Sequence, residues 1–209
     1  MGFKVIRPFG PSVAKVTIPD DLINKLNIYV DKVISDEKKS NQLNHGNDLV
    51  GDVTQEFNLE KKTIEETGWG NFLKNAVNEW IKFDTKKNIS KFEIDYSWVV
   101  RQFENEYNPT HWHSGHISGA GFLKVPSFLG EHVQNKTSRE YRGGNLQLIH
   151  GARIFMCPST LNIIPRVGDL YLFPNYLMHT VFPFKGTDEE RRSISFNANI
   201  DENIYNVYG

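Results

Sequence analysis

The chain has 209 residues, 39% hydrophobic and 12% aromatic, so it can bury a substantial core, and this length favours one domain over two. Lys and Arg number 24 against 25 Asp and Glu, and a net charge of -1 gives no overall field that would attract nucleic acid or anionic lipid. The single cysteine, Cys157, excludes an internal disulfide framework and a multi-cysteine zinc site, as is typical of a reducing compartment.

Membrane association is not expected from the sequence. The opening MGFKVIRPFG lacks the apolar stretch of a signal sequence, and no later segment approaches the roughly 20 apolar residues that span a bilayer. We therefore expect a soluble, cytoplasmic protein.

The first 90 residues predict two strands followed by helices. FKVIRPF and VAKVTI alternate as strands do, and residues 20–34 then have apolar positions at helical spacing. Residues 35–51 are rich in Lys, Asn, Asp and Gly with little periodicity, which predicts a mobile surface connection. A second amphipathic helix is expected at about residues 70–83. We expect this helical part to pack against a sheet.

From about residue 91 to 209 the chain is mostly β. Strand-like runs between turn residues occur at 92–105, 116–125, 144–150, 169–173, 179–184 and 191–200. The connections contain no long helical pattern, which argues against parallel βαβ units and favours an antiparallel barrel or jelly roll.

Three of the seven histidines lie within six residues, in HWHSGH, directly after Asn108-Pro109. If this segment is extended, His111 and His113 share one face, so both imidazoles can reach one metal ion, whereas His116 is out of phase. The pair alone fits hydrogen-bonded histidines near a turn equally well. A third candidate is His179 in LYLFPNYLMHTVFPF, and three such ligands leave coordination positions open, unlike a closed structural site.

A late strand carries a candidate carboxylate-binding pair. In RRSISFN, Arg191, Ser193, Ser195 and Asn197 share one face, and a guanidinium with a hydroxyl two residues on suits a buried carboxylate. An Arg-x-Ser pair is common by itself. Its position one strand after His179 supports a role in binding, because the second carboxylate of an organic acid that chelates the metal would reach this strand.

As an ordered set, these motifs resemble the 2-oxoglutarate–Fe(II) oxygenase superfamily. HWHSGHISGAGFL, GDLYLFPNYLMHTVFPF and RRSISFN are similar to a branch of small oxygenases with a His-x-His motif, over residues 96–201. The resemblance implies a double-stranded β-helix (jelly roll, cupin-like) whose larger sheet is supported by the N-terminal helices. It also implies Fe(II) as cofactor and 2-oxoglutarate as co-substrate.

Carried over to this sequence, the resemblance implies that His111 and His179 bind the metal and that Arg191 and Ser193 bind the C5 carboxylate of 2-oxoglutarate. Most relatives have Asp or Glu where this chain has His113, so the site would hold three neutral imidazoles. Either His113 is a ligand or another group fills its place. No Asp or Glu lies between residues 108 and 120.

The implied activity is hydroxylation of an unidentified substrate, with release of succinate and CO2. One alternative is a three-histidine cupin-type dioxygenase that needs no 2-oxoglutarate, in which Arg191 binds the substrate's own carboxylate. The other is a non-catalytic jelly roll that binds zinc or no metal. Metal analysis and 2-oxoglutarate consumption separate these readings.

Four further polar residues are candidates for the mouth of the site: Gln102, Tyr107, Asn145 and Asn197. Ordinary hydrogen bonding at strand edges explains each of them as well. The polar connection from Asn41 to Glu66 and the loop from Pro126 to Arg142 are candidate substrate lids. We expect a small-molecule or peptide substrate, find no support for nucleic acid, and take a homodimer as the default assembly.

Overall fold

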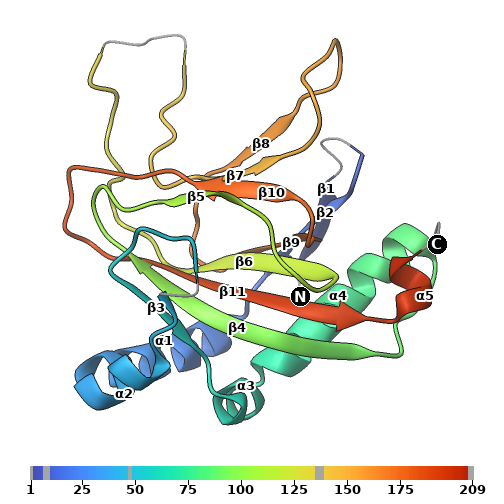
Figure 1. Cartoon of the computed structure of the whole chain (residues 1–209), viewed down its shortest axis with the longest axis horizontal. Coiled ribbons are helices and arrows are strands. Elements are labelled where there is room, and N and C mark those ends of the chain that lie inside the picture. Colours follow the sequence, from blue (N-terminus) through green and yellow to red (C-terminus); the bar gives the residue numbers. More distant parts are fainter. Residues whose placement is uncertain (1, 7–9, 47–48, 135–138, 207–209) are drawn as a thin grey trace.

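The structure is a computed structural model and describes residues 2–6, 10–46, 49–134 and 139–206. Two antiparallel sheets face each other in Figure 1. The major sheet has seven strands in the described residues, in the order β1-β2-β9-β6-β11-β4-β3. Their bounds are Phe3–Ile6, Val13–Thr17, Asp169–Pro174, Ile117–Lys124, Arg191–Ile200, Phe92–Gln102 and Gln55–Asn58.

The minor sheet has four strands in the order β5-β10-β7-β8. They span Asn108–His111, Met178–Val181, Leu146–Ile149 and Thr160–Ile163. A cluster of buried side chains that includes Phe122, Leu148 and Phe173 comes from both sheets and fills the space between them. The expected mainly β, jelly-roll architecture is confirmed.

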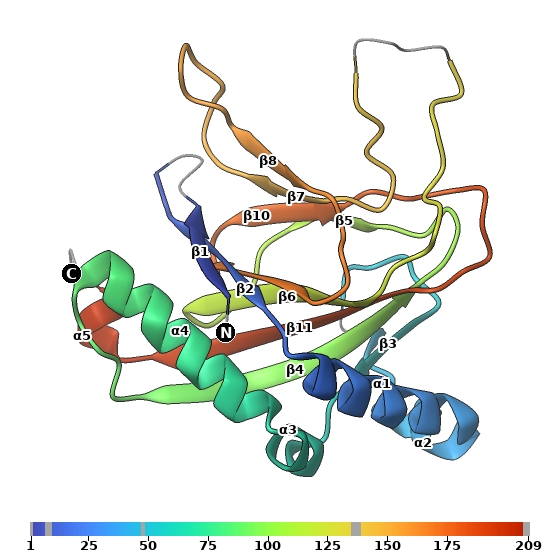
Figure 2. The same ribbon diagram turned by 180° about the vertical axis from the view of Figure 1, so that it is seen from behind.

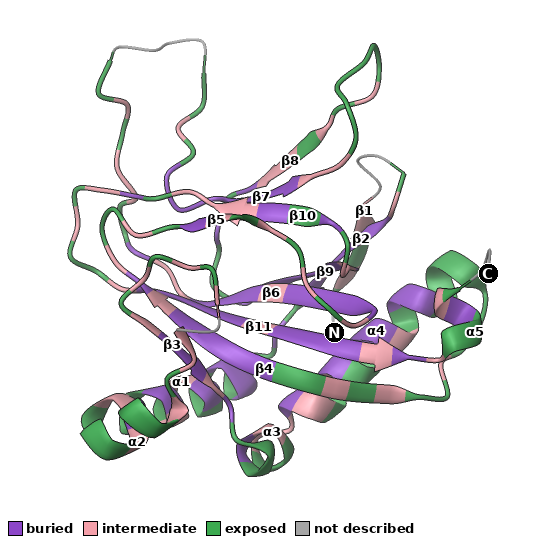
Figure 3. Ribbon diagram, in the orientation of Figure 1, coloured by how far each residue is buried: buried purple, intermediate pink, exposed green. Residues whose placement is uncertain are grey.

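Helices cover the outer face of the major sheet, as Figure 2 shows from behind. The helices are α1 (Asp20–Ser35), α2 (Glu37–Leu43), α3 (Lys61–Thr67), α4 (Trp69–Thr85) and α5 (Glu202–Tyr205). Leu26 and Val30 of α1 and Leu73 of α4 are fully buried in a second core beneath the sheet. Figure 3 shows the buried faces of α1 and α4 turned inward and their exposed faces outward. Among the described helices, none combines the length and apolar character needed to span a membrane.

The strongly periodic segments have the predicted structure. The helices expected at 20–34 and 70–83 are α1 and α4, and the strand expected at 191–200 is β11. The expected first strand is β1, with Arg7, Pro8 and Phe9 outside the described residues. The predicted strands of the second half are present within a few residues, as β4, β6, β7, β9 and β10.

The connection predicted at residues 35–51 is wrong in part, because it contains helix α2. Helix α2 begins after Asp36, whose side chain accepts a hydrogen bond from the Lys39 amide and so caps the helix. β3 and α3 follow, and β3 lies at the edge of the major sheet, paired with β4. The first 90 residues are therefore more than a helical support, since they also contribute β1, β2 and β3 to the major sheet.

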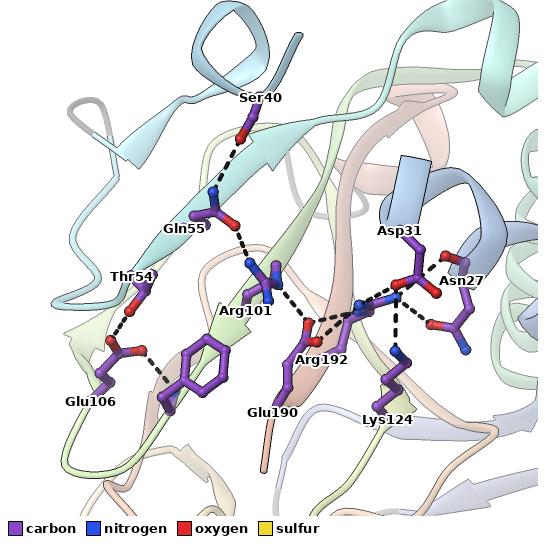
Figure 4. A network of polar contacts seen from close by, with 11 residues as sticks. Asn27, Asp31, Ser40, Thr54, Gln55, Arg101, Glu106, Lys124, Glu190 and Arg192 are labelled. Atoms are coloured by element: carbon purple, nitrogen blue, oxygen red, sulfur yellow. Dashed lines mark hydrogen bonds and ion pairs between the residues drawn. The ribbon is translucent and has the colours of Figure 1, made fainter. Parts of the chain in front are cut away.

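A network of charged groups ties α1 to the outer face of the major sheet (Figure 4). Arg192, which is 1% exposed, donates to both carboxylate oxygens of Glu190 and to Asp31 Oδ1 at 2.7 Å. Glu190 also accepts from Arg101 Nε at 2.8 Å. These pairings compensate the buried cation and fix the register of β11, so that its odd-numbered residues point to the opposite face, toward the minor sheet.

Candidate metal and carboxylate site

A cavity of about 220 Å³ lies between the two sheets, and we call it the central cavity. His111 and His179 line it from the minor sheet, together with His113 beyond the end of β5. Arg191, Ser193 and Ser195 line it from β11 of the major sheet. The sequence-predicted metal ligands and carboxylate-binding pair therefore line the same cavity.

The three imidazoles converge on one point. His111 and His179 face each other as Cα partners of β5 and β10. Their ring centroids are 4.3 Å apart, and the ring of His113 lies 4.9 Å from each. The Nε2 atoms of His113 and His179 are 3.1 Å apart, and one nitrogen from each ring lies within 4.8 Å of the others.

Main-chain carbonyls orient two of the rings. His111 Nδ1 lies 2.7 Å from the Pro109 carbonyl oxygen, and His179 Nδ1 lies 2.9 Å from that of Leu177. If each Nδ1 carries the proton and donates it to the carbonyl, each Nε2 keeps its lone pair directed at the common point. This is the usual outer-shell arrangement of metal-binding histidines.

His113 lies beyond the end of β5 and is held by a different device. Its amide donates to the Asn175 carbonyl oxygen at 3.1 Å, and Asn175 Nδ2 donates to the His113 carbonyl oxygen at 3.1 Å. Asn175 Oδ1 in turn accepts from the Tyr205 hydroxyl at 3.0 Å. The Asn of FPNYL thus fixes the third imidazole, a function that strand periodicity gave no reason to expect.

Burial keeps the imidazoles neutral. Desolvation, together with a smaller contribution from the nearby histidines, lowers the pKa of His113 to about 3 and that of His179 to about 4. Desolvation also lowers the pKa of His111, against the opposing effect of its Pro109 hydrogen bond. Neutral imidazoles offer lone pairs to a cation without competition from protons near pH 7.

Arg191 is 1% exposed, yet no acidic side chain of the described residues pairs with it. Its Nε donates to the Gly144 carbonyl oxygen at 3.0 Å, and Nη1 lies 3.4 Å from Ser193 Oγ. Its guanidinium carbon stands 5.1 Å from the centre of the Phe122 ring. Burial lowers its pKa to about 10, so Arg191 remains charged and can bind a carboxylate entering the cavity.

The other predicted polar candidates lie outside the lining of the central cavity. Tyr107 is 40% exposed and pairs through its main chain with Asp52. Asn197 accepts from Ser118 Oγ, Gln102 Nε2 donates to main-chain carbonyls, and the main-chain oxygen of Asn145 accepts from the Phe182 amide. Their roles toward a ligand stay predictions.

His116, the third histidine of HWHSGH, points away from the metal candidates. Its ring stacks on Tyr205 at 4.0 Å, Nδ1 accepts from the Ile200 amide, and Nε2 lies 3.3 Å from Glu202. His116 therefore holds the C-terminal helix in place. Its position out of phase with His111 and His113 agrees with its absence from the triad.

The two candidate lids differ in position. Leu49 and Val50 of the first line the central cavity, while Asn47 and Asp48 lie outside the described residues. Of the second, His132, Arg139 and Arg142 line a separate pocket, and residues 135–138 lie outside the described residues. Glu56 of β3 also lines the central cavity, and no sequence pattern predicted this.

Comparison with known proteins agrees with this geometry. Residues 96–197, about half of the chain, match a family model described as "Putative 2OG-Fe(II) oxygenase". A search of the curated proteins gave no match.

Several solved structures have a similar fold. A prolyl-4-hydroxylase from Pseudomonas putida shares 15% identity with a TM-score of 0.56, over 88% of this chain and 91% of that one. HygX from Streptomyces hygroscopicus, solved with nickel and 2-oxoglutarate, shares 9% with a TM-score of 0.55, over 90% and 82%. A prolyl hydroxylase from Trichoplax adhaerens, in complex with a peptide of hypoxia inducible factor, shares 14% with a TM-score of 0.55, over 100% and 87%. At sequence identities this low, the similarity shows a shared fold and no shared substrate.

Proposed function

We propose that this chain, which belongs to the 2-oxoglutarate–Fe(II) oxygenases, hydroxylates an organic substrate and converts 2-oxoglutarate and dioxygen to succinate and CO2. The proposal treats residues 1–209 as one oxygenase domain. The observation that supports it most strongly is the central cavity, in which three neutral imidazoles and an unpaired buried guanidinium line the same space.

In this proposal His111, His113 and His179 hold Fe(II). Nitrogen ligands about 2.1 Å from an ion and at right angles to one another would be about 3.0 Å apart, which agrees with the 3.1 Å between the Nε2 atoms of His113 and His179. When bound, iron supplies the centre at which the 2-oxo acid chelates and dioxygen is activated for C–H oxidation. The protein holds the ligands neutral and oriented before the metal arrives.

Arg191 and Ser193 bind the far carboxylate of 2-oxoglutarate in this proposal. A guanidinium buried without an acidic partner is unfavourable until an anion joins it, so the carboxylate would gain a strong charge-assisted contact. Ser193 Oγ adds a donor beside Nη1. Phe122, Leu146 and Val181 contribute apolar walls to the cavity, and apolar walls favour the exclusion of water from a reacting centre.

His113 in place of the common carboxylate leaves the metal site one charge more positive. A dianionic co-substrate would then balance Fe(II) in a site with no anionic ligand. We expect this extra positive charge to favour 2-oxoglutarate binding in the metal-loaded protein.

The substrate in this proposal is a small molecule or a peptide, as in the prolyl hydroxylases with a similar fold. Trp112 is 65% exposed and lines the central cavity, so it marks the side open to solvent. A net charge of -1 gives no support for nucleic acid.

Metal binding tests the triad. His179→Ala should weaken Mn(II) or anaerobic Fe(II) binding at least 100-fold in calorimetric titration, because the two remaining rings form an incomplete site. His132→Ala is the control, since His132 lines a separate pocket and is no part of the triad. Unchanged metal affinity in His179→Ala would refute the proposed site.

Turnover tests the co-substrate. The Fe(II)-loaded protein should bind 2-oxoglutarate with the visible absorption band of a metal–keto-acid chelate. With ascorbate as the electron donor it should slowly form succinate even without substrate. A protein that binds Fe(II) but never 2-oxoglutarate would instead favour the three-histidine dioxygenase, with Arg191 bound to the substrate's own carboxylate.

A further inference from the structure

Glu56 stands at the same level of the major sheet as the proposed co-substrate site. It pairs with Val100 of β4, and Val100 pairs with Ser193 of β11. Two strand spacings separate the Cα atoms of Glu56 and Ser193, roughly 10 Å. Glu56 is the only acidic residue among the described residues that line the central cavity.

The Glu56 carboxylate is buried without compensation. The residue is 1% exposed, Oε1 accepts from Asn108 Nδ2 at 3.3 Å, and Oε2 has no hydrogen-bond partner among the described residues. Desolvation raises its pKa to about 7. Glu190 provides the contrast, because two arginines pair with it and its pKa is lowered.

The surroundings hold Glu56 in place. A Cβ atom on Gly51 would lie 2.7 Å from Asn108 Nδ2 and 2.8 Å from Glu56 Oε1, so only glycine lets the main chain pack directly on this pair. Leu49 and Val50, just before it, line the cavity beside Glu56. Glu56 therefore lines the cavity with its carboxylate packed against Gly51 and Asn108, and one of its oxygens has no partner among the described residues.

Aromatic rings line the same cavity. Tyr96, Trp98 and Trp112 all contribute to it, and the rings of Tyr96 and Trp98 are 5.7 Å apart. The faces of such rings attract cations, most strongly where water is excluded. A carboxylate together with three aromatic side chains is a combination that suits a positively charged nitrogen.

The described lining of the cavity has one arginine and one acidic side chain, and each favours a different ligand. Arg191 attracts a carboxylate, whereas Glu56 repels the dianionic co-substrate and leaves its side of the cavity to another group. We propose that Glu56 binds a cationic nitrogen of the substrate, so that the protein acts on a compound carrying a primary or methylated amine. This inference rests on the proposed function and names the class of its substrate.

The test compares three fragments of equal length: n-butylammonium, n-butanol and butyrate. The protein is loaded with Mn(II) and 2-oxoglutarate, and the paramagnetic relaxation of the fragment protons is followed by NMR. Because this effect falls steeply with distance from the ion, it reports binding in the cavity. We expect n-butylammonium to bind at least five times more tightly than n-butanol, and butyrate to compete with 2-oxoglutarate instead.

Glu56→Gln should abolish the preference for the ammonium, since it keeps the shape of the side chain and removes its charge. Glu93→Gln is the matched control, because Glu93 lies on β4, is exposed and is outside the cavity lining. Equal binding of n-butanol and n-butylammonium to the wild-type protein, or a preference that survives in Glu56→Gln, would overturn the inference.

Failure of the proposed function gives a different result. The wild-type protein would then bind no Mn(II) or no 2-oxoglutarate. The same fragments can still be compared on the metal-free wild-type and Glu56→Gln proteins through protein amide shifts. A charge preference lost in Glu56→Gln would uphold the role of Glu56, and its absence would refute it.

Discussion

Arg191 and Arg192 are neighbours in the chain, both 1% exposed, and oppositely placed. Arg192 faces the helices and pairs with Glu190 and Asp31 (Figure 4). Arg191 faces the minor sheet, where its guanidinium contacts the Gly144 carbonyl oxygen, the Ser193 hydroxyl and the Phe122 ring. One arginine serves the fold, and the other is available to a ligand.

Substitution of the two arginines should separate these roles. Arg192→Met removes the buried cation that Glu190 and Asp31 share, and should lower the free energy of unfolding by about 3 kcal/mol. Arg191→Met removes an uncompensated charge but also the donor to the Gly144 carbonyl, so we expect a change of about 1 kcal/mol or less in the ligand-free protein. Urea unfolding measures both. In the presence of Mn(II), 2-oxoglutarate should stabilise the wild-type protein but not Arg191→Met. An equal stabilisation of both would contradict the proposal that Arg191 binds its carboxylate.

Glu56 should make stability depend on pH. Burial raises its pKa in the folded state to about 7, above the usual 4.5, so the folded protein holds a proton that the unfolded chain releases between these values. Stability therefore falls as pH rises from about 4.5 to 7, by about 3 kcal/mol at most. Glu56→Gln removes this loss.

The variant should thus be more stable than the wild-type protein in urea unfolding at pH 8, and the gain should shrink toward pH 5. A gain that is the same at both pH values would show that the carboxylate is already compensated. Greater stability with a weaker ammonium preference would identify Glu56 as a group that serves binding at a cost to folding.

At the scale of elements, the outer helices support the sheet that carries Arg191. Leu73 of α4 is 0% exposed and belongs to the core that joins α4 to the major sheet. Its neighbour Lys74 is exposed. The helix therefore has one face whose packing determines how firmly β11 and β4 are held.

Leu73→Ala should lower the free energy of unfolding by roughly 3 kcal/mol, because the lost methyl groups leave a cavity. Lys74→Ala, one residue away on the solvent side, should change it by less than about 0.5 kcal/mol. Urea denaturation of the two variants checks this pair, and equal effects would show that α4 does not contribute to the core as described.

The same elements show what sequence patterns can predict. α1, α4 and β11 have long, clear periodicity, and their limits lie within two residues of the expected ones. α2, β3 and α3 were missed because they are short and polar and depend on contacts distant in sequence. β3, for example, is a strand because it pairs with β4, 40 to 46 residues further along the chain. Glu56 was missed with it, since its burial follows from that pairing.

In the molecule as a whole, the candidate ligands are shared between the two sheets. The histidines belong to the minor sheet and the turn after β5, whereas Arg191 and Ser193 belong to the major sheet. The ordered motifs were enough to predict the set, because each has its own local signature. Their convergence depends on how the sheets face each other, which no single motif specifies.

Metal and co-substrate should therefore stabilise the protein cooperatively. 2-Oxoglutarate bound to both the ion and Arg191 would connect the two sheets, so Mn(II) and 2-oxoglutarate together should raise the midpoint of thermal unfolding by more than the sum of their separate effects. Differential scanning fluorimetry with each ligand alone and with both measures this. Strictly additive shifts would mean that the two ligands occupy unconnected sites.

Two hydrogen bonds between Asn175 and His113 set the third imidazole apart from the other two. His111 and His179 lie on paired strands, whereas His113 lies on the turn after β5, which is held by one main-chain and one side-chain hydrogen bond to Asn175. Substitution of His113 by Asp would therefore change the charge of the metal site while the pairing of β5 with β10 stays as it is. The reactivity of a bound metal ion could thus be altered at this turn without a change in the surrounding sheets.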